Sequence, residues 1–139
     1  MNDSPIEKLL AAIDGLDLDA VMALVAPDVR VLVVDGRRAE GADAMREVLE
    51  EFVGTLRSTN HRITARWHVD DVWIAEMEAS YELRSFMQIE SLPRAVVLRE
   101  GPDGIAELRF YGAHEHPVNE HDTGEEWGNL VRGRWIPPL

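Results

Sequence analysis

Three side chains that could transfer protons or donate hydrogen bonds lie near the ends of apolar segments: Asp35, Tyr81 and His114. An imidazole has an ordinary pKa of about 6.5, so His114 is a candidate general base, with a solvated histidine at a strand end as the plainer alternative. Tyr81 could orient a substrate carbonyl through its hydroxyl or serve only as a core aromatic residue. Asp35 precedes Gly36 in a strong hairpin signal, so it is either a base at the mouth of a pocket or an ordinary turn residue.

The segment 62–83, which contains Tyr81, organises the rest of the chain, because it alternates apolar and polar residues over two predicted strands with Asp70-Asp71 between them. Side chains alternate faces along a strand, which places all the apolar members on one face. In the first strand, 62–69, these are Ile63, Ala65, Trp67 and Val69; in the second, 73–83, they are Trp73, Ala75, Met77, Ala79, Tyr81 and Leu83.

The other elements precede and follow this pair of strands. A helix opens at Ser4-Pro5 and ends at Gly15, a second runs from about Asp17 to before Pro27, and a third occupies 42–56. A hairpin is predicted at 28–40, and two further strands at 93–100 and 105–114. Helices followed by strands predict an α+β domain in which the helices pack on one face of a mostly antiparallel sheet.

Composition excludes several classes of function. The 139 residues are 45% hydrophobic, enough for one domain with its own core, and there is no cysteine for disulfides. A formal charge of −12 argues against a nucleic-acid partner. The start of the chain has no basic segment leading into an apolar run, and no apolar stretch is long enough to cross a membrane, so we expect a cytoplasmic protein without a membrane partner.

Several segments resemble the NTF2-like superfamily, and in particular its SnoaL-like branch, which is related to polyketide cyclases, ketosteroid isomerases and limonene epoxide hydrolases. The resemblance is carried by 18–29, by Asp35-Gly36, by 40–46 and by 103–111. It implies a cone, with the sheet curved around the helices and an apolar cavity between them. It also implies a homodimer and chemistry without a cofactor or a metal.

We therefore expect a domain at 1–116 and a tail at 117–139 that packs on the domain or on a partner subunit. The resemblance together with strand alternation implies a pocket for a hydrophobic small molecule. His61, at the start of the first strand, could contact a ligand at the rim or belong to a turn. The expected ligand-binding residues are Leu9, Val33, Phe52, His61, Trp67, Trp73, Met77 and Phe110.

The acids of the best-known relatives are missing from this sequence. The isomerase general base falls at Val33, no carboxylate occurs within 92–98, and the epoxide hydrolase acid falls at Phe110. Two hypotheses remain open. One is a cofactor-independent isomerase, cyclase, dehydratase or hydrolase, with His114, Tyr81 and Asp35 as its catalytic candidates. The other is a non-catalytic domain that binds a ligand or dimerises.

Overall fold

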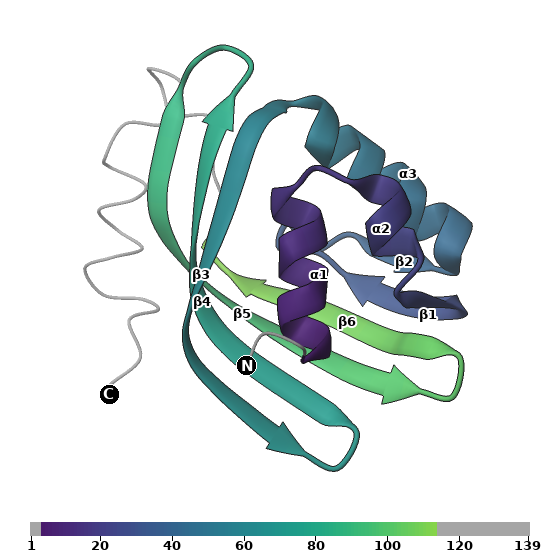
Figure 1. Ribbon diagram of the computed structural model, residues 1–139. Helices are drawn as coiled ribbons and strands as arrows, with labels where there is room; N and C mark the ends of the chain where they lie inside the picture. Colours follow the sequence, from purple (N-terminus) through teal and green to yellow (C-terminus); the bar gives the residue numbers. More distant parts are fainter. Residues whose placement is uncertain (1–3, 114–139) are drawn as a thin grey trace.

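The computed structural model describes residues 4–113, which form one curved, unclosed sheet of six strands with the helices gathered on its concave side (Figure 1). This is the predicted α+β class. The elements, in chain order, are α1 (Pro5–Asp14), α2 (Leu18–Met22), β1 (Val25–Leu32), β2 (Arg38–Glu40), α3 (Ala42–Gly54), β3 (Leu56–Val69), β4 (Val72–Leu83), β5 (Gln88–Gly101) and β6 (Gly104–Gly112).

The sheet is mostly antiparallel, as predicted. Its strand order is β2-β1-β6-β5-β4-β3, and only the β1–β6 pair is parallel. The last strand therefore returns to lie beside the first. The sheet curves around the helices, so a site on its concave side can be assembled from several strands (Figure 1).

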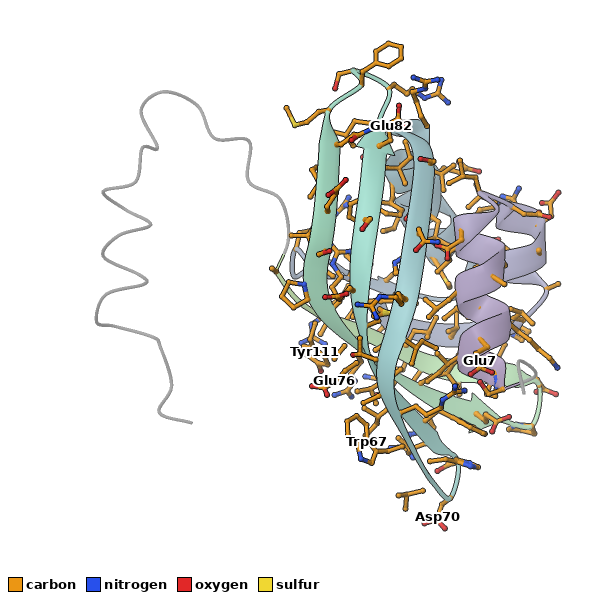
Figure 2. All side chains as sticks on the ribbon, turned by 60° about the vertical axis from the view of Figure 1, so that its left-hand side comes forward. Glu7, Trp67, Asp70, Glu76, Glu82 and Tyr111 are labelled. Atoms are coloured by element: carbon orange, nitrogen blue, oxygen red, sulfur yellow. The ribbon has the colours of Figure 1, made fainter. Side chains whose placement is uncertain are left out.

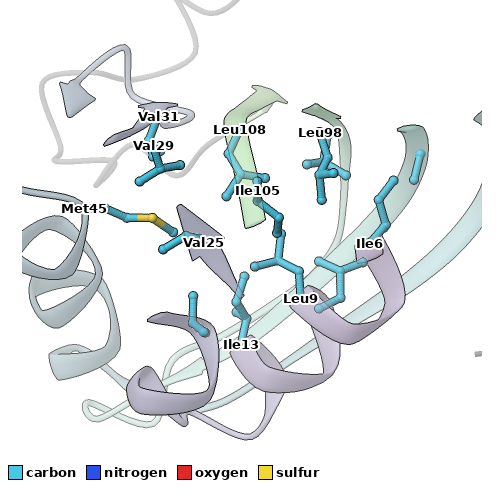
Figure 3. Close-up of a cluster of buried hydrophobic side chains, with 14 of the residues drawn as sticks. Ile6, Leu9, Ile13, Val25, Val29, Val31, Met45, Leu98, Ile105 and Leu108 are labelled. Carbon is cyan, nitrogen blue, oxygen red and sulfur yellow. The ribbon is translucent and has the colours of Figure 1, made fainter. Parts of the chain in front are cut away.

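The first helix forms for the reasons that the sequence indicates. The hydroxyl of Ser4 accepts a hydrogen bond from the backbone N–H of Glu7 at 3.2 Å, and Pro5 occupies the first turn, where its missing N–H has no cost. One face of the helix is buried and consists of Ile6, Leu9, Leu10 and Ile13. These side chains pack against the sheet residues Leu98, Ile105 and Leu108, so α1 is held chiefly by apolar burial (Figure 3).

The predicted alternation in the second strand is confirmed. Ala75, Met77, Ala79 and Tyr81 in β4 are all buried, and each is at most 6% exposed. All four are paired with residues of β5, which lies on the side of β4 opposite to β3. This strand therefore keeps one face toward the helices along most of its length.

The alternation predicted for the first strand is wrong beyond Ile63. The β3–β4 pairing shifts by one residue there, because Ile63 lies opposite Met77 whereas Ala65 lies opposite Glu76. A bulge of this kind inverts the faces of every residue that follows it. Trp67 and Val69 are consequently 49% and 67% exposed.

The bulge changes the direction of two side chains, Trp67 and Arg66. Trp67 points away from the helices, on the same outer side of the sheet as Tyr111 (Figure 2). Arg66, which the simple alternation places outside, instead forms an ion pair with Glu7 of α1.

Three strands begin several residues earlier than predicted. β1 begins at Val25, inside the predicted second helix, because the backbone there pairs with β6 at Ile105. β3 and β5 begin several residues earlier than their alternation suggests, at Leu56 and Gln88. None of the helices within residues 4–113 is long and apolar enough to cross a membrane.

Candidate functional site

A cavity of about 230 Å³ opens between the helices and the concave face of the sheet. It is bounded by the ends of α1 and α3, by the β1–β2 hairpin and by strands β3 to β6. Most of its wall is apolar, and the polar groups are few. The lining residues are Ile13, Val33, Val34, Asp35, Arg37, Val48, Leu49, Phe52, Thr55, Leu56, His61, Tyr81, Leu83, Arg94 and Phe110.

Helix α3 forms one apolar side of this cavity. Its stripe of hydrophobic residues has helical spacing, yet only Met45 is fully buried. Val48, Leu49 and Phe52 are only partly buried because they face the cavity. The hydrophobic stripe of α3 is therefore divided between the core and the cavity wall.

His61 is the cavity residue best suited to accept a proton. Its side chain is 4% exposed, and its Nδ1 lies 2.6 Å from Oδ1 of Asp14 at the end of α1. The other carboxylate oxygen of Asp14 accepts the backbone N–H of His61 at 3.0 Å. One carboxylate thus fixes both the ring and the main chain of His61.

The Asp14 carboxylate also determines which ring nitrogen of His61 can react. An ionised carboxylate can only accept, so Nδ1 of His61 carries the proton and donates it to Asp14. In the neutral ring, Nε2 then has a lone pair. Within residues 4–113 no group is hydrogen-bonded to Nε2, which makes it available to a ligand.

Tyr81 lies at the centre of the aromatic groups of the cavity. Its ring makes edge-to-face contacts with Phe52, at 5.6 Å between centroids, and with His61, at 6.3 Å. Nη1 of Arg94 donates a hydrogen bond to the Tyr81 hydroxyl, and the guanidinium carbon lies 5.0 Å from the ring centroid. The hydroxyl is therefore held beside a positive charge at the cavity wall.

The mouth of the cavity carries an ion-pair cluster. Arg37 bridges Asp35 of the β1–β2 hairpin and Glu51 of α3, with 2.9 Å between its Nε and Oδ2 of Asp35. These contacts, first with Glu51 and then with Asp35, raise the pKa of Arg37 above its ordinary value and keep it charged. Asp35 accepts from both the side chain and the backbone N–H of Arg37, so it serves to hold the hairpin.

The structure brings together some of the residues that the sequence singled out and separates others. Val33, Phe52, His61, Phe110, Tyr81 and Asp35 all line the cavity. Leu9 and Met77 are instead fully enclosed in the hydrophobic core, and the cavity wall does not include them. His114 lies outside the described residues, as does the predicted tail 117–139.

The two predicted tryptophans do not line the cavity. Trp67 is on the outer face because of the bulge in β3. Trp73 stacks on His68 with 3.5 Å between ring centroids, and its Nε1 donates to Glu100 at 2.6 Å. Both contacts hold Trp73 at the far end of the β3–β4 hairpin, away from the cavity.

Two functional residues, Arg94 and Asp14, are missing from the prediction. Arg94 has the same strand alternation as the buried Val96 and Leu98, so the signal for its inward direction was present. Asp14 lies four residues after the buried Leu10 and thus near the inner face of α1. Its contact with His61, which is 47 residues away, has no local signal.

Metal binding has no support in this part of the protein. Within residues 4–113 there is no group of three or more histidine, aspartate or glutamate side chains that could hold a metal ion.

The known proteins that match this chain share one fold. The model of the SnoaL-like domain matches residues 6–115. A hypothetical protein from Catenulispora acidiphila with a ketosteroid isomerase-like fold, solved in complex with trimethylamine, has a TM-score of 0.72 at 16% identity, covering 81% of this chain and 88% of that one. No curated protein matches the sequence.

Two further structures show the same fold. An NTF2-like protein of unknown function from Burkholderia pseudomallei has a TM-score of 0.70 at 15% identity, covering 81% of this chain and 90% of its own. An LEH-like epoxide hydrolase from M. tuberculosis has a TM-score of 0.68 at 17% identity, covering 78% of this chain and 76% of its own. At these identities the likeness concerns the fold alone.

Proposed function

Because the chain belongs to the SnoaL-like domain family, we propose that its cavity binds a small hydrophobic molecule and that the protein is a cofactor-independent enzyme of the isomerase, cyclase, dehydratase or hydrolase type. The step common to these reactions is proton transfer to and from the substrate. The observation that carries the proposal is the Asp14–His61 pair, with its ring inside the cavity.

The proposed step is removal of a proton from a carbon next to a substrate carbonyl. The C–H bond breaks as Nε2 of His61 takes the proton, and the electron pair forms a carbon–carbon double bond while the carbonyl π pair moves to oxygen. Asp14 stabilises the imidazolium that results. The hydroxyl of Tyr81 donates a hydrogen bond to the developing oxyanion, and the hydrogen bond that Tyr81 accepts from Arg94 strengthens this donor.

The size and polarity of the cavity limit the substrate. An apolar cavity of about 150 Å³ is enough for benzene, so a cavity of about 230 Å³ accommodates a molecule of one or two rings. Most of the wall is apolar, and a hydrogen bond made beside apolar surface is stronger than one made in water. Both features favour a compact hydrophobic substrate with one or a few oxygen atoms.

Incorporation of deuterium from D₂O into 2-tetralone, a two-ring ketone with exchangeable carbon-bound protons, tests this proposal. We expect the protein to accelerate the exchange above the buffer rate. Substitution of Tyr81→Phe should lower the rate by about 10-fold to 100-fold, because one oxyanion donor is lost while Arg94 remains. Mass spectrometry of the recovered ketone measures the exchange.

A Tyr81→Phe variant that binds 2-tetralone and exchanges it at the full wild-type rate would contradict the role given to the hydroxyl. Thr59→Val offers a matched control, because Thr59 is a buried polar residue directly opposite Tyr81 on β3 but does not line the cavity. This variant should keep the wild-type exchange rate.

Ligand binding without catalysis is the second candidate function. It is favoured by the apolar residues Val33 and Phe110 on the cavity wall. It is also favoured by the ion pair of Asp35 with Arg37, since Asp35 is the one carboxylate that residues 4–113 contribute to this wall. This function predicts that the protein binds 2-tetralone but exchanges it no faster than buffer. The exchange measurement therefore separates the two candidates.

A further inference from the structure

We propose that residues 127–136 of this chain dock on the outer face of the sheet, against an apolar patch that spans strands β3 to β6. This outer patch consists of Trp67, Ile74, Ala95, Val97 and Tyr111. It lies on the opposite side of the sheet from the cavity, so the inference adds an interaction surface within the chain and does not depend on the proposed function.

The strand pairing assembles the outer patch from four neighbouring strands. Trp67 of β3 lies opposite Ile74 of β4, and Ile74 lies opposite Val97 of β5. Ala95, two residues before Val97, lies opposite Tyr111 of β6. Residues that lie opposite each other on neighbouring strands share a face of the sheet, so these five side chains form one continuous surface.

The burial of alternate residues shows that this surface faces outward. Ala75, Val96 and Leu108 are 0% exposed in the core beneath the helices, so the residues next to them along each strand point to the other side of the sheet. Figure 2 shows Trp67 and Tyr111 on this outer side. Trp67 is 49% exposed and Tyr111 is 43% exposed, so two large aromatic side chains are available to a partner segment.

The outer patch also carries a negative charge. Glu76 lies on the same face of β4 as Ile74, and Figure 2 shows it between the two aromatic residues. The next acid on this face, Glu78, forms an ion pair with Arg62. Glu76 is exposed and forms no ion pair within residues 4–113. A segment that combines apolar side chains with positive charge therefore fits this surface.

The sequence of the chain contains one such segment. The only charged side chains of residues 127–136 are Arg132 and Arg134, and their apolar side chains are Trp127, Leu130, Val131, Trp135 and Ile136. Burial of these side chains against the outer patch removes apolar surface from water on both sides of the contact. A second copy of the patch, related by a two-fold axis, would instead bring its own Glu76 toward this one, and like charges at an interface are unfavourable.

The position of β6 allows the same chain to reach the patch. β6 ends at Gly112, directly after the patch residue Tyr111. Residues 114–126 can span at most about 45 Å when they are extended. The outer patch crosses four strands, or roughly 15 Å. Residues 127–136 can therefore lie on any part of the patch without a contribution from another molecule.

Cleavage of the full chain by trypsin tests the inference, because Arg132 and Arg134 are trypsin sites within the docking segment. Mass spectrometry of the released C-terminal peptides measures the cleavage rate at these two sites. We expect the wild-type chain to be cleaved at least about 10-fold more slowly than a synthetic peptide of residues 114–139, because a docked segment has to detach before the protease can bind it.

Trp67→Ser removes the largest apolar side chain of the outer patch and should raise the cleavage rate of the full chain by about 10-fold. Phe86→Ser is the matched control. Phe86 is also a large and exposed aromatic residue, but it lies in the turn between β4 and β5, outside the patch. This variant should be cleaved at the wild-type rate.

A second variant tests the charge and keeps every apolar residue of the patch. Glu76→Arg should raise the cleavage rate by about 2-fold to 5-fold, because it replaces attraction to Arg132 and Arg134 by repulsion at an exposed site. Glu90→Arg makes the same change at an exposed position nearer the start of β5. It should leave the rate unchanged.

A wild-type chain that is cleaved as fast as the peptide would overturn the inference. A Trp67→Ser chain cleaved no faster than the wild type would also overturn it, and this is the result expected if the segment covers the mouth of the cavity instead. Protection that increases with protein concentration would place the segment on a second copy and contradict docking within one chain. Protection that is independent of concentration and lost in Trp67→Ser would support the inference.

Discussion

Replacement of His61 by glutamine is expected to reduce deuterium exchange into 2-tetralone by about 10²-fold to 10⁴-fold, the usual contribution of a positioned general base. Glutamine has a similar size and can still donate a hydrogen bond to Asp14, but it has no ring nitrogen to accept a proton at the position of Nε2. Binding of the ketone should change little, because the apolar wall of the cavity is unaltered. Calorimetry and mass spectrometry measure the two properties separately.

His68→Gln is the matched control for this prediction. His68 is also on β3, but it is exposed, stacks on Trp73, and donates from Nε2 to the backbone carbonyl of Asp70 at 2.8 Å. This variant should exchange the ketone at the wild-type rate. If His61→Gln keeps more than about half of the wild-type rate at equal ligand occupancy, His61 is not the base.

Replacement of Gly112 by alanine is expected to lower the free energy of unfolding by about 3 kcal/mol or more. Gly112 has a φ of +129°, which a side chain tolerates poorly, and a Cβ there would lie 2.4 Å from the carbonyl oxygen of Pro93 and 2.9 Å from Cα of Arg94. Backbone atoms of a paired strand cannot move aside cheaply.

Gly36→Ala separates the two contributions to this effect. Gly36 also has a positive φ, of +93°, but a Cβ there meets nothing within 4 Å. Only the conformational cost of about 1 to 2 kcal/mol is therefore expected. Urea denaturation measures both variants, and equal losses of stability would show that the contact with Pro93 and Arg94 has no effect.

The fold could be predicted because its signals are local and agree with one another. The cap at Ser4, the apolar face of α1 and the alternation along β4 each require only neighbouring residues. Burial then follows from the same pattern, since the face with Ala75 and Met77 is the one that contacts the helices. When helices pack on one side of a sheet, the apolar face of the sheet and the apolar faces of the helices cover each other.

The predictions that are wrong concern interactions that no local sequence pattern contains. The bulge between Ile63 and Ala65 is a property of the β3–β4 pairing, and its effect on Trp67 cannot be recognised in β3 alone. Arg94 is an exception, because the alternation of β5 places it on the same face as the buried Val96 and Leu98. The Asp14–His61 contact joins a helix end to a strand 47 residues later and depends on the tertiary fold.

The ¹⁵N spectrum of the histidine side chains, recorded at mildly alkaline pH with and without saturating 2-tetralone, tests the central claim most directly. The His61 signals are assigned by their loss in His61→Gln. We expect a His61 ring protonated at Nδ1 and unprotonated at Nε2, with the Nε2 signal shifting when the ketone binds. A proton on Nε2 in place of Nδ1, or His61 signals unchanged by bound ketone, would contradict it.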